Sequence, residues 1–206
     1  MKLSAIQQIC KGAKRIEFYT PDDGVQWIGD GGALYPLYDL PRLEGENVFT
    51  MFDIPENKRN KISLWEYGEL PQNLYAGDVD EAESLVEQGN ISVNLNGRSL
   101  LPLKTSLGAV YINQKYLIPF KDSENGVQLY ERTTKGGKVY IAVKEGFLLT
   151  GIILPYDTIT QGFIEELEEL CELSRVALEN KGNARGGIYG TCQEGILYQK
   201  KIDFDE

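Results

Sequence analysis

Apolar and polar residues alternate over most of the chain, which predicts a protein built mainly of β-strands. Residues 15–20, RIEFYT, and residues 91–103, ISVNLNGRSLLPL, alternate in this way. The turn signals PDDG at 21–24 and Asn96-Gly97 predict β-hairpins beside these strands. Residues 147–154 are apolar almost throughout, which predicts a central strand covered on both faces.

The rest of the first half predicts a strand over residues 47–54, a helical turn after Pro55 and a strand over residues 62–68. In the second half, short apolar segments separated by turns predict an antiparallel meander, with KYLIPF at 115–120 as one of its strands.

Two stretches have the periodicity of helices. The first covers residues 3–13, where Ser4 and Gln7 have the spacing of a capping box. The second covers residues 158–180, with acids in its first half and bases toward its end, as the helix dipole favours. One face of this long helix carries Phe163, Leu167, Leu170, Cys171, Ser174 and Ala177.

A phrase of the first half recurs in the second. Residues 24–39 read GVQWIGDGGALYPLYD, and residues 108–122 read GAVYINQKYLIPFKD. Both copies predict a strand, a reversal and a second strand. A repeated ligand loop would need matched polar groups, and only the final Asp matches. We therefore interpret the repeat as an internally duplicated structural unit.

The predicted fold class is α+β, with two β-rich halves of mainly antiparallel strands, a short N-terminal helix and a long helix near the C-terminus. The first half covers residues 1–67, and the second, a β-meander plus helix, covers residues 91–181. The acidic residues 68–90 predict a surface linker with a helical turn near Asp80 to Gln88. Residues 182–206 predict a flexible tail.

Composition excludes several kinds of chemistry. The 206 residues include no histidine, which removes Ser-His-Asp and Cys-His catalysis and imidazole metal ligands. The three cysteines, without CxxC spacing, favour free thiols in a reducing cytoplasm, and Cys10 and Cys171 lie in apolar helical stripes. A net charge of −10 with scattered bases disfavours direct binding of nucleic acid.

We expect a cytoplasmic protein. No apolar run approaches the roughly 20 residues that cross a bilayer, and the N-terminal sequence lacks the pattern of a signal peptide.

No motif predicts catalysis. GDGGA at 29–33 lacks the Lys and the helix that a phosphate loop needs, so we interpret Asp30 as a turn residue. DVDEAE at 78–83 matches only the first two ligands of a calcium loop. We therefore expect a non-enzymatic protein with no cofactor and no metal. An enzyme that uses carboxylates and a metal is kept as an alternative.

Aromatic residues predict a protein-binding surface, because Tyr and Trp are favoured at interfaces. Most lie on predicted strands, namely Tyr19, Trp27, Tyr35, Tyr38, Trp65, Tyr67, Tyr111, Tyr116, Tyr130, Tyr140 and Tyr156. The alternative is ordinary half-buried Tyr on a sheet. Our preferred contact surface runs from Trp27 to Leu40, and its named residues are Trp27, Asp30, Leu34, Tyr35 and Tyr38.

The C-terminal sequence QKKIDFDE is a second candidate contact. Gln199, Ile202 and Phe204 resemble the loose pattern with which replication proteins bind sliding clamps. A terminal strand is the alternative interpretation of the same residues.

Four long segments resemble a family of uncharacterised proteins encoded by phages and prophages of Gram-positive bacteria. They read VQWIGDGGALYPLYDLPRL, TMFDIPENKRNKI, LYERTTKGGKVYIAVKEGFLLTGIILPYDTI and FIEELEELCELSRVALENK. The resemblance implies a role in a mobile element, near replication or recombination, and supplies no catalytic residues. A fainter similarity is to sliding-clamp modules, from which the chain departs by having two helices and no basic inner face.

We therefore expect an accessory protein that binds a phage or host protein of replication, recombination or defence. One alternative is an acidic inhibitor that imitates nucleic acid, and another is a clamp-like processivity factor. The acidic surface of the inhibitor hypothesis consists of Glu66, Glu69, Asp78, Asp80, Glu81, Glu83 and Glu87.

Overall fold

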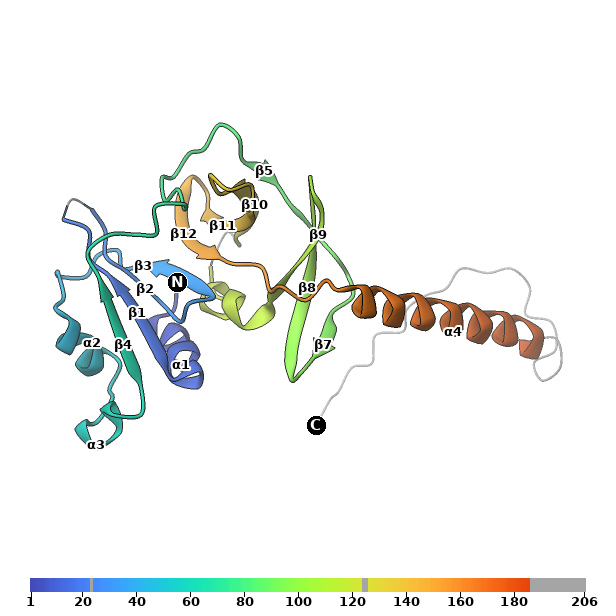
Figure 1. The fold of residues 1–206 in the computed structure, drawn as a ribbon, viewed down its shortest axis with the longest axis horizontal. Helices are drawn as coiled ribbons and strands as arrows, with labels where there is room; N and C mark the ends of the chain where they lie inside the picture. The colour runs from blue at the N-terminus through green and yellow to red at the C-terminus, as the bar shows by residue number, and fades with distance from the viewer. Residues whose placement is uncertain (23, 124–125, 186–206) are drawn as a thin grey trace, which may run out of the picture. The chain divides into compact units, whose positions relative to one another are not determined.

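The computed structural model describes residues 1–22, 24–123 and 126–185 (Figure 1). Contacts divide the chain into two compact units, residues 1–157 and residues 158–206. The α+β prediction is confirmed: a short helix begins the chain, strands in two sheets follow, and a long helix comes last. No helix in the described part is long and apolar enough to cross a membrane.

The first unit contains an eight-stranded sheet, which we call sheet A. In spatial order its strands are β4 (Ser63–Tyr67), β1 (Arg15–Tyr19), β2 (Trp27–Gly29), β3 (Ala33–Pro36), β12 (Leu148–Ile153), β11 (Val139–Glu145), β10 (Gln128–Thr133) and β5 (Ser84–Leu85). Among the described strands of this sheet, β1 and β4 pair in parallel and the other neighbours pair antiparallel. The pairing of β3 with β12 joins strands from both halves of the chain into one sheet.

A second, smaller sheet is built around β8 (Arg98–Thr105) and is called sheet B. Its other strands, all antiparallel to β8, are β6 (Glu87–Gln88), β7 (Val93–Leu95) and β9 (Gly108–Asn113). Asn96 and Gly97 connect β7 to β8 with φ of 50° and 73°, so the predicted Asn-Gly hairpin is confirmed.

Helix α1 (Leu3–Ala13) contacts β1, β2 and the 3₁₀ helix η1 (Gln114–Phe120). It buries Ala5, Ile6, Ile9 and Cys10, and the predicted helix over residues 3–13 is confirmed. The predicted capping box is wrong, because Lys2 is the N-cap residue and makes no side-chain cap. The Gln7 amide instead donates to the Phe52 carbonyl, which ties α1 to the end of α2 (Gly45–Met51).

Two local predictions fail where tertiary contacts override sequence preference, and a third is confirmed. Residues 47–54 predict a strand, but most of them belong to α2 or the turn after it, with Val48, Phe49 and Phe52 in the core. The segment near Asp80 to Gln88 forms β5 and β6 instead of a helical turn. The short α3 (Glu56–Arg59) confirms the helical turn after Pro55.

The repeated phrase folds differently in its two places. Its first copy forms β2, a reversal and β3, as predicted, whereas its second copy forms β9 followed by η1. The prediction of a second strand in that copy is therefore wrong. Because Ile118 and Pro119 lie in η1 and not in a strand, this segment contacts α1.

Both faces of sheet A are covered. Ile16, Phe18 and Ile141 belong to a core cluster that also includes residues of α1, α2 and η1. The residues that alternate with them in the strands, such as Tyr19 and Tyr140, belong to a second cluster on the opposite face. That second face is covered by Leu70, Leu74 and Ala76, which come from the predicted acidic linker.

A buried ion cluster fastens this covering segment to the sheet. Arg132 of β10 is almost fully buried and donates to Glu83 Oε2 at 2.5 and 2.8 Å. It also donates to the carbonyls of Tyr75, Gly77 and Asp78 at 2.8–3.3 Å. Lys144 of β11 approaches the other oxygen of Glu83 to 2.6 Å.

Removing the Glu83 carboxylate should leave two buried cations unpaired. We expect Glu83→Ala to lower the free energy of unfolding by about 3–5 kcal/mol. Glu87→Ala is the matched control, since Glu87 lies in the same acidic segment but pairs with Lys104 in the open, and it should cost under about 1 kcal/mol. Urea denaturation measures both, and equal losses would contradict the role given to Glu83.

The same carboxylate should make stability depend on pH. Burial alone would raise the pKa of Glu83, but hydrogen bonds and charge from Lys144 and Arg132 leave it below its ordinary 4.5. Its contribution is then complete above the unfolded pKa and is lost as the pH falls through the folded one. The difference in unfolding free energy between the wild type and Glu83→Gln should shrink on acidification from neutral pH. A constant difference would contradict this.

Candidate functional site

The structure buries most of the predicted aromatic contact surface. Trp27 is 4% exposed, Tyr35 is fully buried and Leu34 is also buried. The prediction that they form an exposed surface is wrong, because β2 and β3 lie inside sheet A with both faces covered. Strand β3 lies between β2 and β12, and its last residue, Pro36, follows the residues that pair with β12. The half-buried Tyr38 donates its hydroxyl to the Leu149 carbonyl at 2.8 Å.

Gln199, Ile202 and Phe204, the predicted tail contact, lie outside the described residues. The predicted flexible tail also begins too early, since α4 (Gln161–Arg185) continues past residue 182. The free cysteines differ in their surroundings: Cys10 is buried, as predicted, but Cys171 is exposed.

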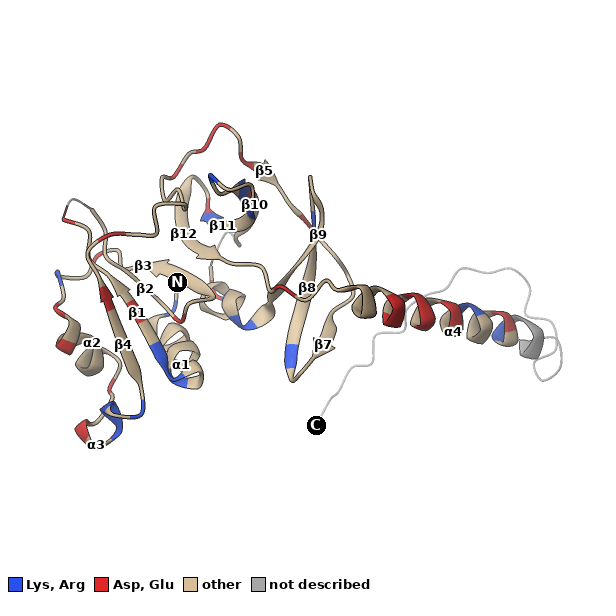
Figure 2. Ribbon diagram, in the orientation of Figure 1, with Lys and Arg blue, Asp and Glu red and all other residues tan. Residues whose placement is uncertain are grey.

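Part of the predicted acidic surface is engaged within the molecule. Glu83 is bound by two cations, and the Asp78 carboxylate accepts the Leu149 amide at 2.8 Å. Asp80 caps the Ala82 amide at 3.0 Å, and the Glu66 carboxylate lies against Gly45 at the start of α2. Glu66, Glu69, Asp78, Glu81 and Glu87 are exposed. Figure 2 shows the resulting distribution of acids and bases along the ribbon.

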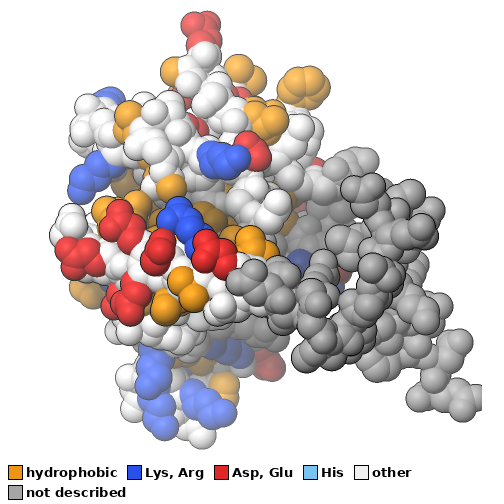
Figure 3. All heavy atoms as spheres, turned by 90° about the vertical axis from the view of Figure 1, so that its right-hand side faces the viewer, with side chains coloured by type: hydrophobic (Ala, Val, Ile, Leu, Met, Phe, Trp, Pro, Cys, Tyr) orange, Lys and Arg blue, Asp and Glu red, His pale blue; other side chains and the backbone are white. Residues whose placement is uncertain are grey.

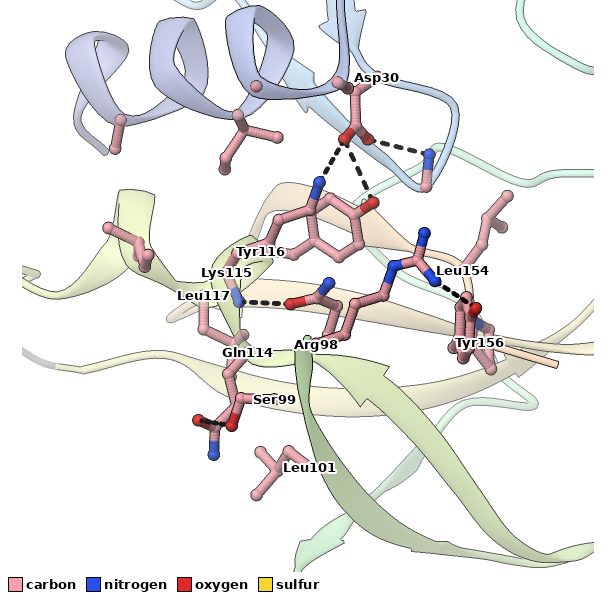
Figure 4. Close-up of a pocket in the computed structure, with 18 of the residues that line it drawn as sticks. Asp30, Arg98, Ser99, Leu101, Gln114, Lys115, Tyr116, Leu117, Leu154 and Tyr156 are labelled. Atoms are coloured by element: carbon pink, nitrogen blue, oxygen red, sulfur yellow. Dashed lines mark hydrogen bonds and ion pairs between the residues drawn. The ribbon is translucent and has the colours of Figure 1, made fainter. Parts of the chain in front are cut away.

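Asp30, which follows β2, connects two parts of the first unit that lie far apart in the sequence. Its residue is 8% exposed, and its Oδ1 accepts the Gly32 amide at 3.0 Å. This bond confirms the prediction of a turn residue. Its Oδ2 accepts Lys115 Nζ at 2.8 Å and the Tyr116 hydroxyl at 3.2 Å (Figure 4). Asp30 therefore holds the β2–β3 turn against η1.

Local sequence explains how these donors reach Asp30. Asn113 ends β9 and its side chain accepts the Lys115 amide at 3.1 Å, which caps η1. Lys115 and Tyr116 then occupy its first turn. Gly32 lies directly under the Tyr116 hydroxyl, where any β-carbon would collide with the ring. The pair Gly32 and Tyr116 thus sets the close approach of turn and helix.

Burial favours the protonated forms of the Tyr116 hydroxyl and the Cys10 thiol, the two weakly acidic groups near Asp30. It raises the pKa of the Tyr116 hydroxyl, and the charge of Asp30 and its hydrogen bond raise it further. Burial, with the charge of Asp30, also raises the pKa of Cys10, whose thiol lies 3.4 Å from the Gly29 carbonyl oxygen. Tyr116 is thus a hydrogen-bond donor, and Cys10 is not a thiolate nucleophile.

A groove with a volume of about 1310 Å³ opens beside Asp30. Its walls come from α1, the β2–β3 turn, η1, the start of β8 and the segment 154–157 (Figure 4). That last segment is extended and held in place, because the Leu154 amide donates to Gly32 and the Tyr156 amide donates to Tyr111, at 2.9 and 2.6 Å. The groove therefore has a preformed backbone frame.

Charged and aromatic side chains line this groove. The Arg98 guanidinium lies 4.8 Å from the ring centre of Tyr156 and donates a hydrogen bond to its hydroxyl. Lys115 and Lys121 add two more cations, and the acids of the lining are Asp30 and Asp157. Apolar area comes from Ile9, Leu101, Leu117, Ile118 and Leu154. Such a lining suits a ligand with both a negative and an apolar group.

Sequence reasoning found Asp30 but missed Arg98, Lys115, Tyr116 and Tyr156 as parts of one site. Lys115 and Tyr116 lie in the repeated phrase, where they were interpreted as strand residues. Their meeting with Asp30, 85 and 86 positions earlier, depends on tertiary packing. The signal within reach was Asn113 two residues before Lys115, a spacing typical of a helical cap.

Exposed aromatic residues lie on the edge strand β4 instead of on β2 and β3. Trp65 is 50% exposed, with the Arg15 guanidinium 5.5 Å from its ring, and Tyr67 stacks on Tyr19 at 4.8 Å.

Among the described residues, no group of three or more acidic or Cys side chains is placed to hold a metal ion.

Weakening Asp30 should loosen the groove. We expect Asp30→Asn to lower the free energy of unfolding by about 1–3 kcal/mol, because the half-buried Lys115 loses its counter-charge and the Tyr116 hydroxyl loses a charged acceptor. Asp122→Asn is the control, since Asp122 pairs with Lys2 at an exposed position, and it should cost less than about 1 kcal/mol. Denaturation curves give both values. An Asp30→Asn protein as stable as the wild type would contradict the tether.

Comparison of the chain with protein-family models, with curated proteins and with solved structures gave no match. The resemblance to phage and prophage proteins therefore stays a prediction. The function proposed below rests on the contacts of the groove.

Proposed function

We propose that this protein acts by binding another protein, and that the groove beside Asp30 receives an extended acidic segment of that partner. The observation that carries the proposal is a preformed groove lined by Arg98 and Lys121. None of the ion pairs found in the described part of the chain involves either of these two cations.

The size of the groove favours a peptide over a small molecule. Pockets for small ligands typically measure about 300–1,000 Å³, whereas this one has about 1310 Å³. An extended segment of several residues fills such a space.

The charges favour a carboxylate. Arg98 presents a planar fork of donors, of which one is used by the Tyr156 hydroxyl, and such a fork pairs with a carboxylate through two bonds. Lys121 lies on the same lining. In a chain whose net charge is −10, two cations without an acidic partner mark a local site for negative charge.

The fixed backbone frame of the groove favours tight binding, because little free energy is needed to order the protein when a ligand binds. Asp30 fixes η1, and backbone hydrogen bonds fix residues 154–156, before any ligand arrives. Binding to such a frame requires little reordering of the receptor, so more of the contact energy contributes to affinity.

Binding is favoured over catalysis by the state of the groups nearby. The chain has no histidine, and burial raises the pKa values of both Cys10 and Tyr116. The alternative of an acidic inhibitor has less support, because Glu83 and Asp78 are bonded within the molecule. We propose a phage or host protein as partner, in keeping with the resemblance of the sequence.

Selection from a displayed library of random peptides tests the proposal. We expect the wild-type protein to enrich peptides that combine Asp or Glu with apolar residues. Arg98→Glu with Lys121→Glu should weaken their binding by about tenfold or more, equivalent to about 1.4 kcal/mol, in fluorescence polarisation.

Lys104→Glu is the matched control, since Lys104 is exposed on the same strand as Arg98 but does not line the groove. It should leave binding unchanged. Peptides that bind the double variant as tightly as the wild type would refute the proposed site, and so would a selection that enriches no peptide.

A further inference from the structure

Helix α4 carries an apolar stripe that the described chain leaves exposed. Leu178 is 70% exposed, Ile164 and Cys171 are also exposed, and Leu167 is half-buried. Ile164, Leu167, Cys171, Ser174 and Leu178 follow one another at alternating spacings of three and four residues. This spacing places them in one line along the helix and is the pattern of a coiled-coil seam. Figure 3 shows hydrophobic side chains at the surface beside acidic and basic ones.

We propose that two copies of this chain pair through α4, side by side and antiparallel. The seam of a coiled coil is formed by the a and d positions of its heptads, and in an antiparallel pair each a position of one helix faces a d position of the other. In the register that centres the seam, Leu167 faces Leu178 of the second copy, and Cys171 faces its Ser174. Leu170, beside the seam, faces Ala177.

The distribution of charge selects this direction. The first half of α4 is acidic, and its bases come later, as Figure 2 shows. In the antiparallel register, Glu168 of one copy flanks the seam opposite Arg175 of the other, and the two-fold symmetry makes this contact twice. A parallel pair would instead set the acidic halves side by side and oppose Phe163 to Glu168. Opposite charges at the flanks of a seam set the direction of pairing.

Arg175 is available for this contact. Its present partner is Glu172 on the same helix at 2.9 Å, and both side chains are mostly exposed. Exposed pairs of this kind contribute little to stability, so Arg175 can exchange that partner for Glu168 of the second copy. This proposal rests on α4 alone and is independent of the groove.

Sedimentation equilibrium on the full chain tests for the dimer. We expect a monomer–dimer equilibrium for the wild type. The dissociation constant of the dimer should rise at least tenfold in Glu168→Arg and should return toward the wild-type value when Arg175→Glu is added. The charge exchange distinguishes a lost contact between the helices from a loss of folding, since a variant that merely unfolds would not be rescued. A monomer at every concentration, or a double variant as weak as the single one, would overturn the proposal.

Disulfide trapping tests the direction. In a Cys192→Ser background, Ser174→Cys should give a covalent dimer on mild oxidation, with Cys171 joined to the new cysteine of the other copy in mass spectrometry. Glu169→Cys, on the opposite side of α4, is the control and should not cross-link to Cys171. A bond between the two Cys171 residues as the main product would show a parallel pair and contradict the proposed direction.

Discussion

The hydrogen bonds to the buried Asp30 carboxylate are the interaction on which the candidate site depends. A carboxylate removed from water is costly unless donors surround it, and here they come from the Gly32 amide, Lys115 and Tyr116. Satisfying Asp30 therefore requires η1 to lie against the β2–β3 turn. That contact in turn creates one wall of the groove, which Arg98 and Tyr156 also line.

The same physical rule acts on the opposite face of sheet A with the charges reversed. Arg132 and Lys144 are buried there and need a counter-charge, which Glu83 supplies from the segment that covers the sheet. An acidic stretch that looks like a solvated linker in the sequence is thus a structural cover. The charges of the two clusters hold the fold, whereas Arg98 and Lys121 make no ion pair among the described residues, and we propose that they meet a partner.

The sequence pattern predicted the helices and turns that depend on residues close together in the chain. The helix over residues 3–13, the Asn96-Gly97 turn and the long final helix all appear in the structure. Contacts between distant residues could not be predicted in this way. The burial of Trp27 and Tyr35 depends on the pairing of β3 with β12, more than 100 residues later. The place of Lys115 depends on a 3₁₀ helix in a segment whose apolar residues also suit a strand.

We propose that the protein recognises another protein through its preformed groove. The chemistry of the groove, a carboxylate-binding arginine beside apolar area, matches what a short acidic segment offers. The exposed aromatic residues of β4 are the competing surface, since Trp65 and Tyr67 could also bind a partner.

NMR spectra of the labelled protein, titrated with a peptide enriched by the wild type, distinguish the two surfaces most directly. The account predicts the largest shift changes at the backbone amides of Arg98, Gln114, Lys115, Tyr116 and Tyr156. Changes centred on Trp65 and Tyr67, with the amides of the groove unmoved, would contradict it.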